Sequence, residues 1–86
     1  MQYLSQLTPH FSSADAALVS DAIERYVAQG FPEDQALNFA IAEGPGIIAS
    51  PDPWAHFESV AREGYGFQPH IIQAGMEALP SSSGIT

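Results

Sequence analysis

Residues 12–39 constrain the fold more than any other part of the chain, because their apolar side chains recur at helical spacing. Leu18, Ala22 and Tyr26 follow one another at intervals of four, and polar side chains fill the opposite side. This spacing predicts an amphipathic helix with one apolar face. Gly30 is suited to end that helix and Pro32 to begin the next one. The segment therefore predicts a two-helix hairpin, whose exposed apolar side the rest of the chain must cover.

Capping residues and helix breakers divide the whole chain into short helices. Ser12, with Asp15 three residues later, fits a capping box, and Ser13 is an equally good cap. Either Ser50 or Asp52 is expected to cap the third helix. The expected elements are a short N-terminal turn at 2–8 and helices at about 13–29, 32–43, 51–63 and 69–79. We therefore predict an all-α fold: one small bundle of four to five short helices over residues 1–80, followed by a flexible serine-rich tail at 81–86.

Residues 44–53 are predicted to be the main irregular segment, because two glycines and three prolines disfavour regular structure. Ile47 and Ile48 are apolar, so we expect them to enter the core and pin this loop. At the N-terminus, Leu4, Leu7 and Phe11 are expected to cover the hairpin; the alternative is an arm that docks on a partner.

Charge excludes several classes of partner. The 86 residues carry ten acids, two arginines and no lysine, which gives a net charge of -8. Each arginine follows an acid by four residues, Asp21 before Arg25 and Glu58 before Arg62, which is the favourable order for a helical ion pair. No basic patch remains, so direct binding to nucleic acid or to an anionic membrane is not expected. A basic protein partner fits better; the alternative is that the charge only keeps the protein soluble.

Residues that would support catalysis are scarce. The chain has no cysteine, and without lysine it cannot form a nucleotide-binding loop of the usual type. His10, His56 and His70 belong to three different expected elements, which does not suggest a metal site. We therefore predict a protein that is not an enzyme and uses neither cofactor nor metal. No apolar run approaches the ~20 residues needed to span a bilayer. The N-terminus lacks a secretory signal pattern, so a cytoplasmic location is expected.

Carboxylates and aromatic side chains at helix ends are the candidate partner-binding residues. Glu43 and Glu63 are expected in last helical turns, where the helix dipole disfavours acids. This placement suggests that a partner's arginine or lysine meets them; the alternative is chance placement of acids that only keep the protein soluble. Aromatic residues near turns are the candidates for an exposed patch; the alternative is that they fill the ends of the bundle. The complete candidate set is Glu33, Asp34, Glu43, Glu63, Phe31, Trp54, Tyr65 and Phe67.

Two segments of the chain echo one another. Residues 23–31 and 57–65 each contain a helix end, a glycine and an aromatic residue, ahead of a helix begun by proline. The pattern suggests a duplicated helix-turn-helix unit, although common capping rules also produce it.

The sequence of residues 49–72, ASPDPWAHFESVAREGYGFQPHII, resembles the second half of the nif-locus leader-peptide family. In that family a helix ending in Ala-Lys/Arg-Glu leads through glycine and an aromatic residue into another helix. The chain departs from the family in lacking its usual first half and a double-glycine cleavage site. The resemblance implies a helical domain gripped by a modifying enzyme, with the Ser- and Thr-containing tail as substrate.

Residues 21–43 resemble ubiquitin-associated-type three-helix domains, in which a helix ends in Gly-Phe and the next begins at once, as at Gly30-Phe31-Pro32. The function expected first is a small acidic interaction module that docks on a larger protein. A leader-type precursor peptide and a phage-type inhibitor that blocks a nucleic-acid site with its acids, as anti-CRISPR and anti-restriction proteins do, are the alternatives. Self-association into a homodimer would also cover a thin helical core.

Overall fold

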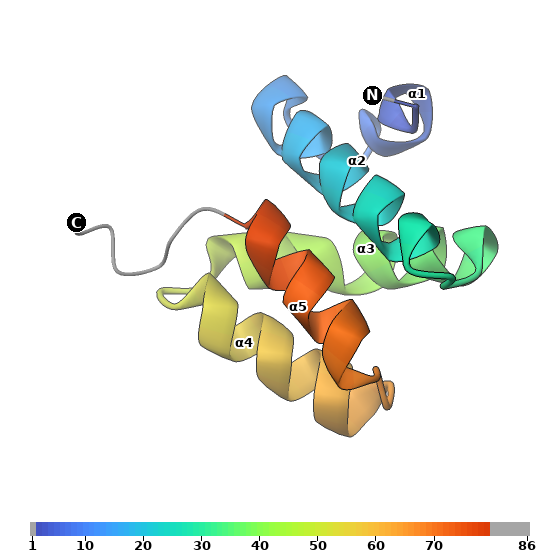
Figure 1. The fold of residues 1–86 in the computed structure, drawn as a ribbon. Helices are drawn as coiled ribbons and strands as arrows, with labels where there is room; N and C mark the ends of the chain where they lie inside the picture. Colours follow the sequence, from blue (N-terminus) through green and yellow to red (C-terminus); the bar gives the residue numbers. More distant parts are fainter. Residues whose placement is uncertain (1, 80–86) are drawn as a thin grey trace.

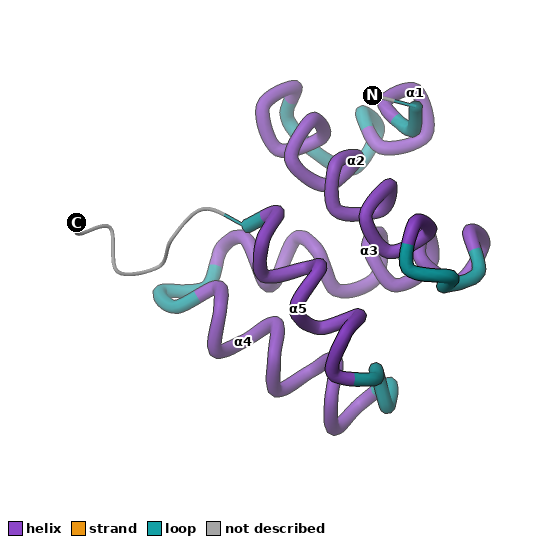
Figure 2. The backbone as a smooth tube through the Cα atoms, in the orientation of Figure 1, coloured by secondary structure: helices purple, strands orange, loops and turns teal. Residues whose placement is uncertain are grey.

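The computed structural model describes residues 2–79, and within them the chain is helical apart from short connections (Figures 1 and 2). The helices are α1 (Leu4–Leu7), α2 (Ser13–Ala28), α3 (Glu33–Ala49), α4 (Pro53–Ser59) and α5 (Pro69–Ala78), and a π-helical turn, Val60–Gly64, continues α4. No strand occurs in the described part, so the predicted all-α bundle is confirmed. The predicted tail at 81–86 lies outside the described residues.

Helix α2 is the centre of the packing. It lies against α1, α3 and α5, while α4 packs on α3 and α5 (Figure 1). The predicted apolar face of α2 is confirmed in part: Ala22 and Tyr26 are buried, while Leu18 is half-buried. Beside this stripe Ile23 is fully buried, but Val27 is exposed. Helix α1 covers the hairpin as expected, because Leu7 is buried and Phe11 packs against the core.

The local signals at the helix ends are largely confirmed. The Asp15 N–H donates to Ser12 Oγ at 3.2 Å, and the Ala55 N–H donates to Asp52 Oδ1 at 3.3 Å. Gly30 has φ 97°, the left-handed conformation that suits a residue after a helix end. Pro32 differs slightly from the prediction: it stands before the first turn of α3 in an extended conformation.

The predicted end of α3 at residue 43 was wrong, because the helix continues through Gly44, Pro45 and Gly46 to Ala49. A proline inside a helix removes one backbone hydrogen bond, which normally disfavours this arrangement. Packing compensates: Gly44 is buried against the ring of Phe11, and Ile47 enters the core with 4% of its surface exposed. The irregular connection is therefore much shorter than the expected 44–53.

Aromatic rings form the centre of the core. Tyr26 stacks on Phe57 with ring centroids 6.4 Å apart, and Phe67 lies 4.7 Å from Phe39. Gly75 lets α5 approach this cluster closely. A Cβ atom at that position would overlap the Phe57 ring and would lie 2.7 Å from Tyr26 Oη.

Candidate functional site

Two glycine turns place Phe31 and Phe67 next to each other. Gly30 and Gly66 have φ 97° and 66°, and each is followed by a phenylalanine. The Phe31 N–H donates to the Tyr26 carbonyl at 3.0 Å, and the Phe67 N–H donates to the Ala61 carbonyl at 2.8 Å. The two rings lie 4.8 Å apart. These turns thus bring segments 36 positions apart in sequence (67 minus 31) to one surface of the bundle.

The internal echo of the sequence pairs Gly64-Tyr65 with Gly30-Phe31, and Gly64 does end a helical segment, the π-helical turn Val60–Gly64. The glycine that matches Gly30 in its positive φ is Gly66, two residues later. The duplication itself stays a prediction.

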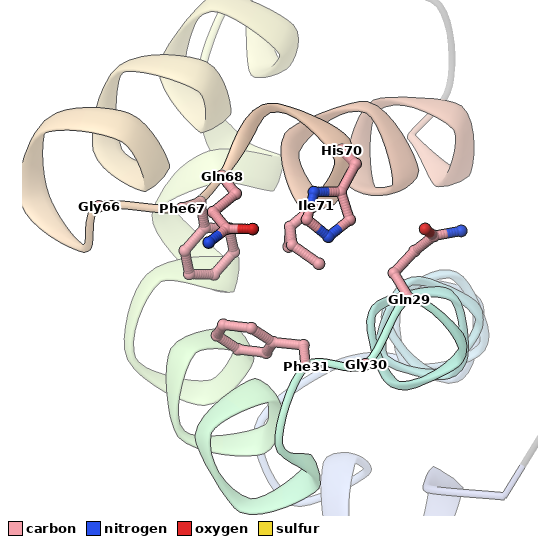
Figure 3. A pocket seen from close by; sticks show the side chains of 8 residues that line it. All are labelled: Gln29, Gly30, Phe31, Gly66, Phe67, Gln68, His70 and Ile71. Carbon is pink, nitrogen blue, oxygen red and sulfur yellow. The ribbon is translucent and has the colours of Figure 1, made fainter.

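A first hollow opens beside these turns, between the end of α2 and the start of α5 (Figure 3). Figure 3 shows the Phe31 and Phe67 rings on one side of it and the side chains of His70 and Gln29 on the other. Its volume is about 320 Å³. The lining residues are Gln29, Gly30, Phe31, Gly66, Phe67, Gln68, His70 and Ile71.

A second hollow of about 270 Å³ lies on the α3 side of the same two phenylalanines. Its floor is aromatic, since Phe39 and Phe67 are only 4% and 7% exposed, while the amide side chains of Gln35 and Asn38 lie at the exposed rim. The lining residues are Phe31, Gln35, Asn38, Phe39, Ala42, Tyr65 and Phe67. Because the two hollows share Phe31 and Phe67, we treat them as one surface feature, the aromatic groove.

Tyr65 forms an exposed wall of the second hollow. Its ring stands at 89° to that of Phe39, with centroids 4.9 Å apart, and 48% of its surface is exposed. Its hydroxyl donates a hydrogen bond of 2.7 Å to Glu43 Oε2. This bond raises the pKa of the Tyr65 phenol, because the carboxylate stabilises the protonated hydroxyl and opposes the phenolate. The contact ties the Gly66 turn to α3 and fixes a carboxylate beside the groove.

Four of the eight candidate residues meet at the aromatic groove. Phe31, Tyr65 and Phe67 line it, and Glu43 borders it through its bond to Tyr65. Two expectations for them were wrong: Phe67 is buried, and Glu43 lies inside α3 rather than in its last turn.

The other candidates are placed elsewhere or serve other contacts. Glu33 accepts a 2.8 Å hydrogen bond from the Tyr3 hydroxyl and so holds the N-terminal segment, which raises the pKa of the Tyr3 phenol. Asp34 is exposed in the first turn of α3. Trp54 is half-buried at the start of α4, and Glu63 lines a third hollow beside Arg62.

Sequence reasoning missed the polar rim of the groove. Gln35, Asn38 and Ala42 stand at positions i, i+3 and i+7 of α3, which places them on one side of that helix. Between them, Phe39 is buried, a position that the sequence pattern did not assign to the core. This spacing was visible in the sequence. That the stripe faces two aromatic turns depends on the tertiary packing.

Both arginines have the partners that the sequence predicted. Arg25 Nε lies 2.8 Å from Asp21 Oδ2, and Arg62 pairs with Glu58. Arg25 also lies 3.6 Å from Glu77 and so connects α2 to α5. Neither arginine is among the residues that line the aromatic groove.

Within residues 2–79, metal ligation and membrane crossing both lack structural support. No three histidine or acidic side chains of this part could hold a metal ion together. None of its helices combines the length and the apolar character that crossing a membrane would require.

Comparison of the chain with protein-family models, with curated proteins and with solved structures gave no match. Function is therefore inferred from the geometry and the charge of the aromatic groove.

Proposed function

We propose that this chain is a non-enzymatic interaction module that docks on a larger, basic-surfaced protein through the aromatic groove. The observation that carries the proposal is the second hollow, where an exposed tyrosine wall and an aromatic floor lie beneath an amide rim. Aromatic side chains in depressions are typical anchor points of protein interfaces, whereas scattered single apolar residues are ordinary surface.

The dimensions of the groove favour a protein segment over a small molecule. Its hollows, of about 320 and 270 Å³, are at or below the small end of the roughly 300–1,000 Å³ typical of ligand pockets. They adjoin one another along the surface, so an extended segment could occupy both. The amides of Gln35, Asn38 and Gln68 can each donate and accept hydrogen bonds, which suits the alternating polar groups of a peptide backbone.

Charge supports a basic partner. The net charge is -8, and both arginines already have acidic partners. A positive patch on a partner would be attracted over a distance of about a Debye length and would be oriented by the acids around the groove. The same charge makes direct binding to nucleic acid or to anionic membranes unfavourable.

The test uses two variants that make the same charge change at different surfaces. Asn38→Arg places a cation at the rim of the second hollow, and Ala55→Arg places one on an exposed position of α4 beside the third hollow. The two variants and the wild-type protein are used as baits in the native host extract at about 0.05 M and about 0.5 M salt. Partners are identified by mass and then purified for measurement of affinity.

We expect a partner that the wild-type and Ala55→Arg proteins retain at low salt and that Asn38→Arg loses, with affinity reduced about tenfold or more. Its affinity should fall as salt rises. A partner that binds all three proteins equally would place the interface elsewhere. No partner in any of the three would contradict docking as the function.

A second candidate is inhibition of a nucleic-acid-handling protein by the same docking. The observation in its favour is the combination of ten acids with no lysine, which could compete with a phosphate backbone. If this is the function, the purified partner binds either the chain or nucleic acid, and a filter-binding competition shows displacement. A stable complex of all three would rule it out.

A further inference from the structure

We propose that the second hollow receives one arginine side chain of the partner, or a lysine in its place. This inference rests on the proposed function and specifies its anchor. The stem of the inserted side chain would contact the Phe31 and Phe67 rings, and its charged end would lie over the exposed face of the Tyr65 ring, beside the Glu43 carboxylate.

The aromatic rings provide both a floor and an accessible wall for such a side chain. Phe67 lies 4.7 Å from Phe39 and 4.8 Å from Phe31, which makes a continuous apolar floor. Tyr65 rises from it, with its ring perpendicular to Phe39 and nearly half its surface exposed. A cation within about 6 Å of an aromatic face is attracted by the ring, and arginine makes such contacts most often.

A carboxylate stands where the charged end would lie. Glu43 uses one oxygen to accept from the Tyr65 hydroxyl. A carboxylate offers about four acceptor sites, so it can also accept from a guanidinium or an ammonium. Asp34 adds negative charge one turn before Asn38 on the same side of α3. The residues that line the second hollow include no cation that would compete.

Other occupants fit less well. A purely apolar side chain would cover the Gln35 and Asn38 amides and the Glu43 carboxylate without replacing their hydrogen bonds to water, which is unfavourable. An acidic side chain would meet Glu43 and the overall negative charge. Lysine and arginine combine an apolar stem with a charged end, which matches an apolar floor beside a carboxylate.

The probe is a peptide selected from a randomised library displayed on phage, with the full chain as bait at low salt. The best peptide that contains arginine is then synthesised together with a copy in which citrulline, a neutral group of the same shape, replaces that arginine. We expect the citrulline copy to bind about tenfold more weakly. Glu43→Gln should weaken binding of the arginine peptide severalfold and leave the affinity for the citrulline copy unchanged.

Glu63→Gln is the matched control, because it removes the same charge from an exposed site beside the third hollow. If Glu43→Gln and Glu63→Gln weaken the arginine peptide equally, net charge attracts the peptide and the proposed anchor is overturned. If the selected peptides lack arginine and lysine but lose binding to Asn38→Arg, the anchor is wrong and the docking function stands. If no peptide is selected, or if Asn38→Arg changes nothing, both proposals fail.

Discussion

Gly75 shows at the scale of one residue how tightly the aromatic core is packed. It lies within α5, where glycine is less favourable than alanine by about 1 kcal/mol, so its presence needs a structural reason. The reason is contact: a Cβ atom there would overlap the Phe57 ring and approach Tyr26 Oη at 2.7 Å. Both rings belong to the cluster that supports the floor of the aromatic groove.

We therefore predict that Gly75→Ala lowers the free energy of unfolding by about 1–3 kcal/mol, as overpacking of a core does. The matched control is Gly46→Ala in α3, where the nearest atom to a new Cβ is His56 Cε1 at 3.8 Å. That change should raise the free energy of unfolding by up to about 1 kcal/mol. Urea unfolding followed by circular dichroism measures both values. A Gly75→Ala protein as stable as wild type would contradict this packing.

The contact between Tyr65 and Glu43 can also be tested at the scale of a single residue. The bond raises the pKa of the Tyr65 phenol above its ordinary value of 10.0, so the neutral hydroxyl is the favoured form. Its contribution to stability is complete below that value and is lost as pH rises through the higher pKa of the folded state. Glu43→Gln should lower the pKa of Tyr65, as resolved by NMR of its ring signals. Glu33→Gln should lower that of Tyr3 and leave Tyr65 unchanged; the reverse pattern would contradict the assignment.

At the scale of an element, the length of α3 is the main feature that local sequence signals did not predict. Caps and periodicity placed the other main helices closely, because those signals act between near neighbours. They failed at Gly44-Pro45-Gly46, where burial against Phe11 and the core outweighs the preference of proline to stop a helix. They also missed the π-helical turn Val60–Gly64, which sets the position of the Gly66 turn and hence the groove. The continuation of α3 depends on contacts between elements that no local pattern encodes.

The continuous α3 predicts that Pro45→Ala stabilises the protein. Alanine would restore an N–H to the exposed position 45 and would relieve the contact of the proline ring with the preceding turn. Helix preference should raise the free energy of unfolding by about 3 kcal/mol. The greater freedom of the unfolded chain offsets up to about 1 kcal/mol of this, which leaves a net gain of about 2 kcal/mol. Pro32→Ala, outside the helical turns, should give no such gain. If Pro45→Ala is neutral in urea unfolding, α3 does not continue past residue 43.

Helix α1 is held by side chains of the hairpin, and one of these contacts depends on pH. The Gln2 N–H donates to Glu24 Oε2 at 3.0 Å, and this bond lowers the pKa of the Glu24 carboxyl from 4.5. A depressed pKa adds stability that is present above pH 4.5 and is lost as pH falls through the lower pKa of the folded state. The protection of the α1 amides against hydrogen exchange, relative to the intrinsic exchange rate at each pH, should therefore fall in acid more than that of the α2 amides. Glu24→Gln should flatten this dependence; an unchanged profile would assign it to other carboxyls.

At the scale of the whole molecule, the acidic charge should affect folding and docking in opposite ways. At a net charge of -8, the acidic side chains repel one another in the compact state. The two arginines offset only part of this repulsion, through local ion pairs. Exposed ion pairs contribute little, roughly 0–1 kcal/mol each, so repulsion should be the larger electrostatic effect on stability. Salt screens both kinds of interaction, with a Debye length of about 8 Å at 0.15 M.

We predict that raising NaCl from about 0.02 to about 0.2 M increases the urea midpoint of the free protein and weakens its complex with the basic partner. The double variant Asp34→Asn, Glu63→Gln replaces two carboxylates by neutral amides. In this variant salt should affect stability less, because less repulsion remains to be screened. A matched increase in sucrose, which carries no charge, controls for general solvent effects. If salt lowers the urea midpoint instead, attraction between the arginines and their acidic partners outweighs repulsion. The acidic surface would then act mainly within the fold, and its charge would not favour a basic partner.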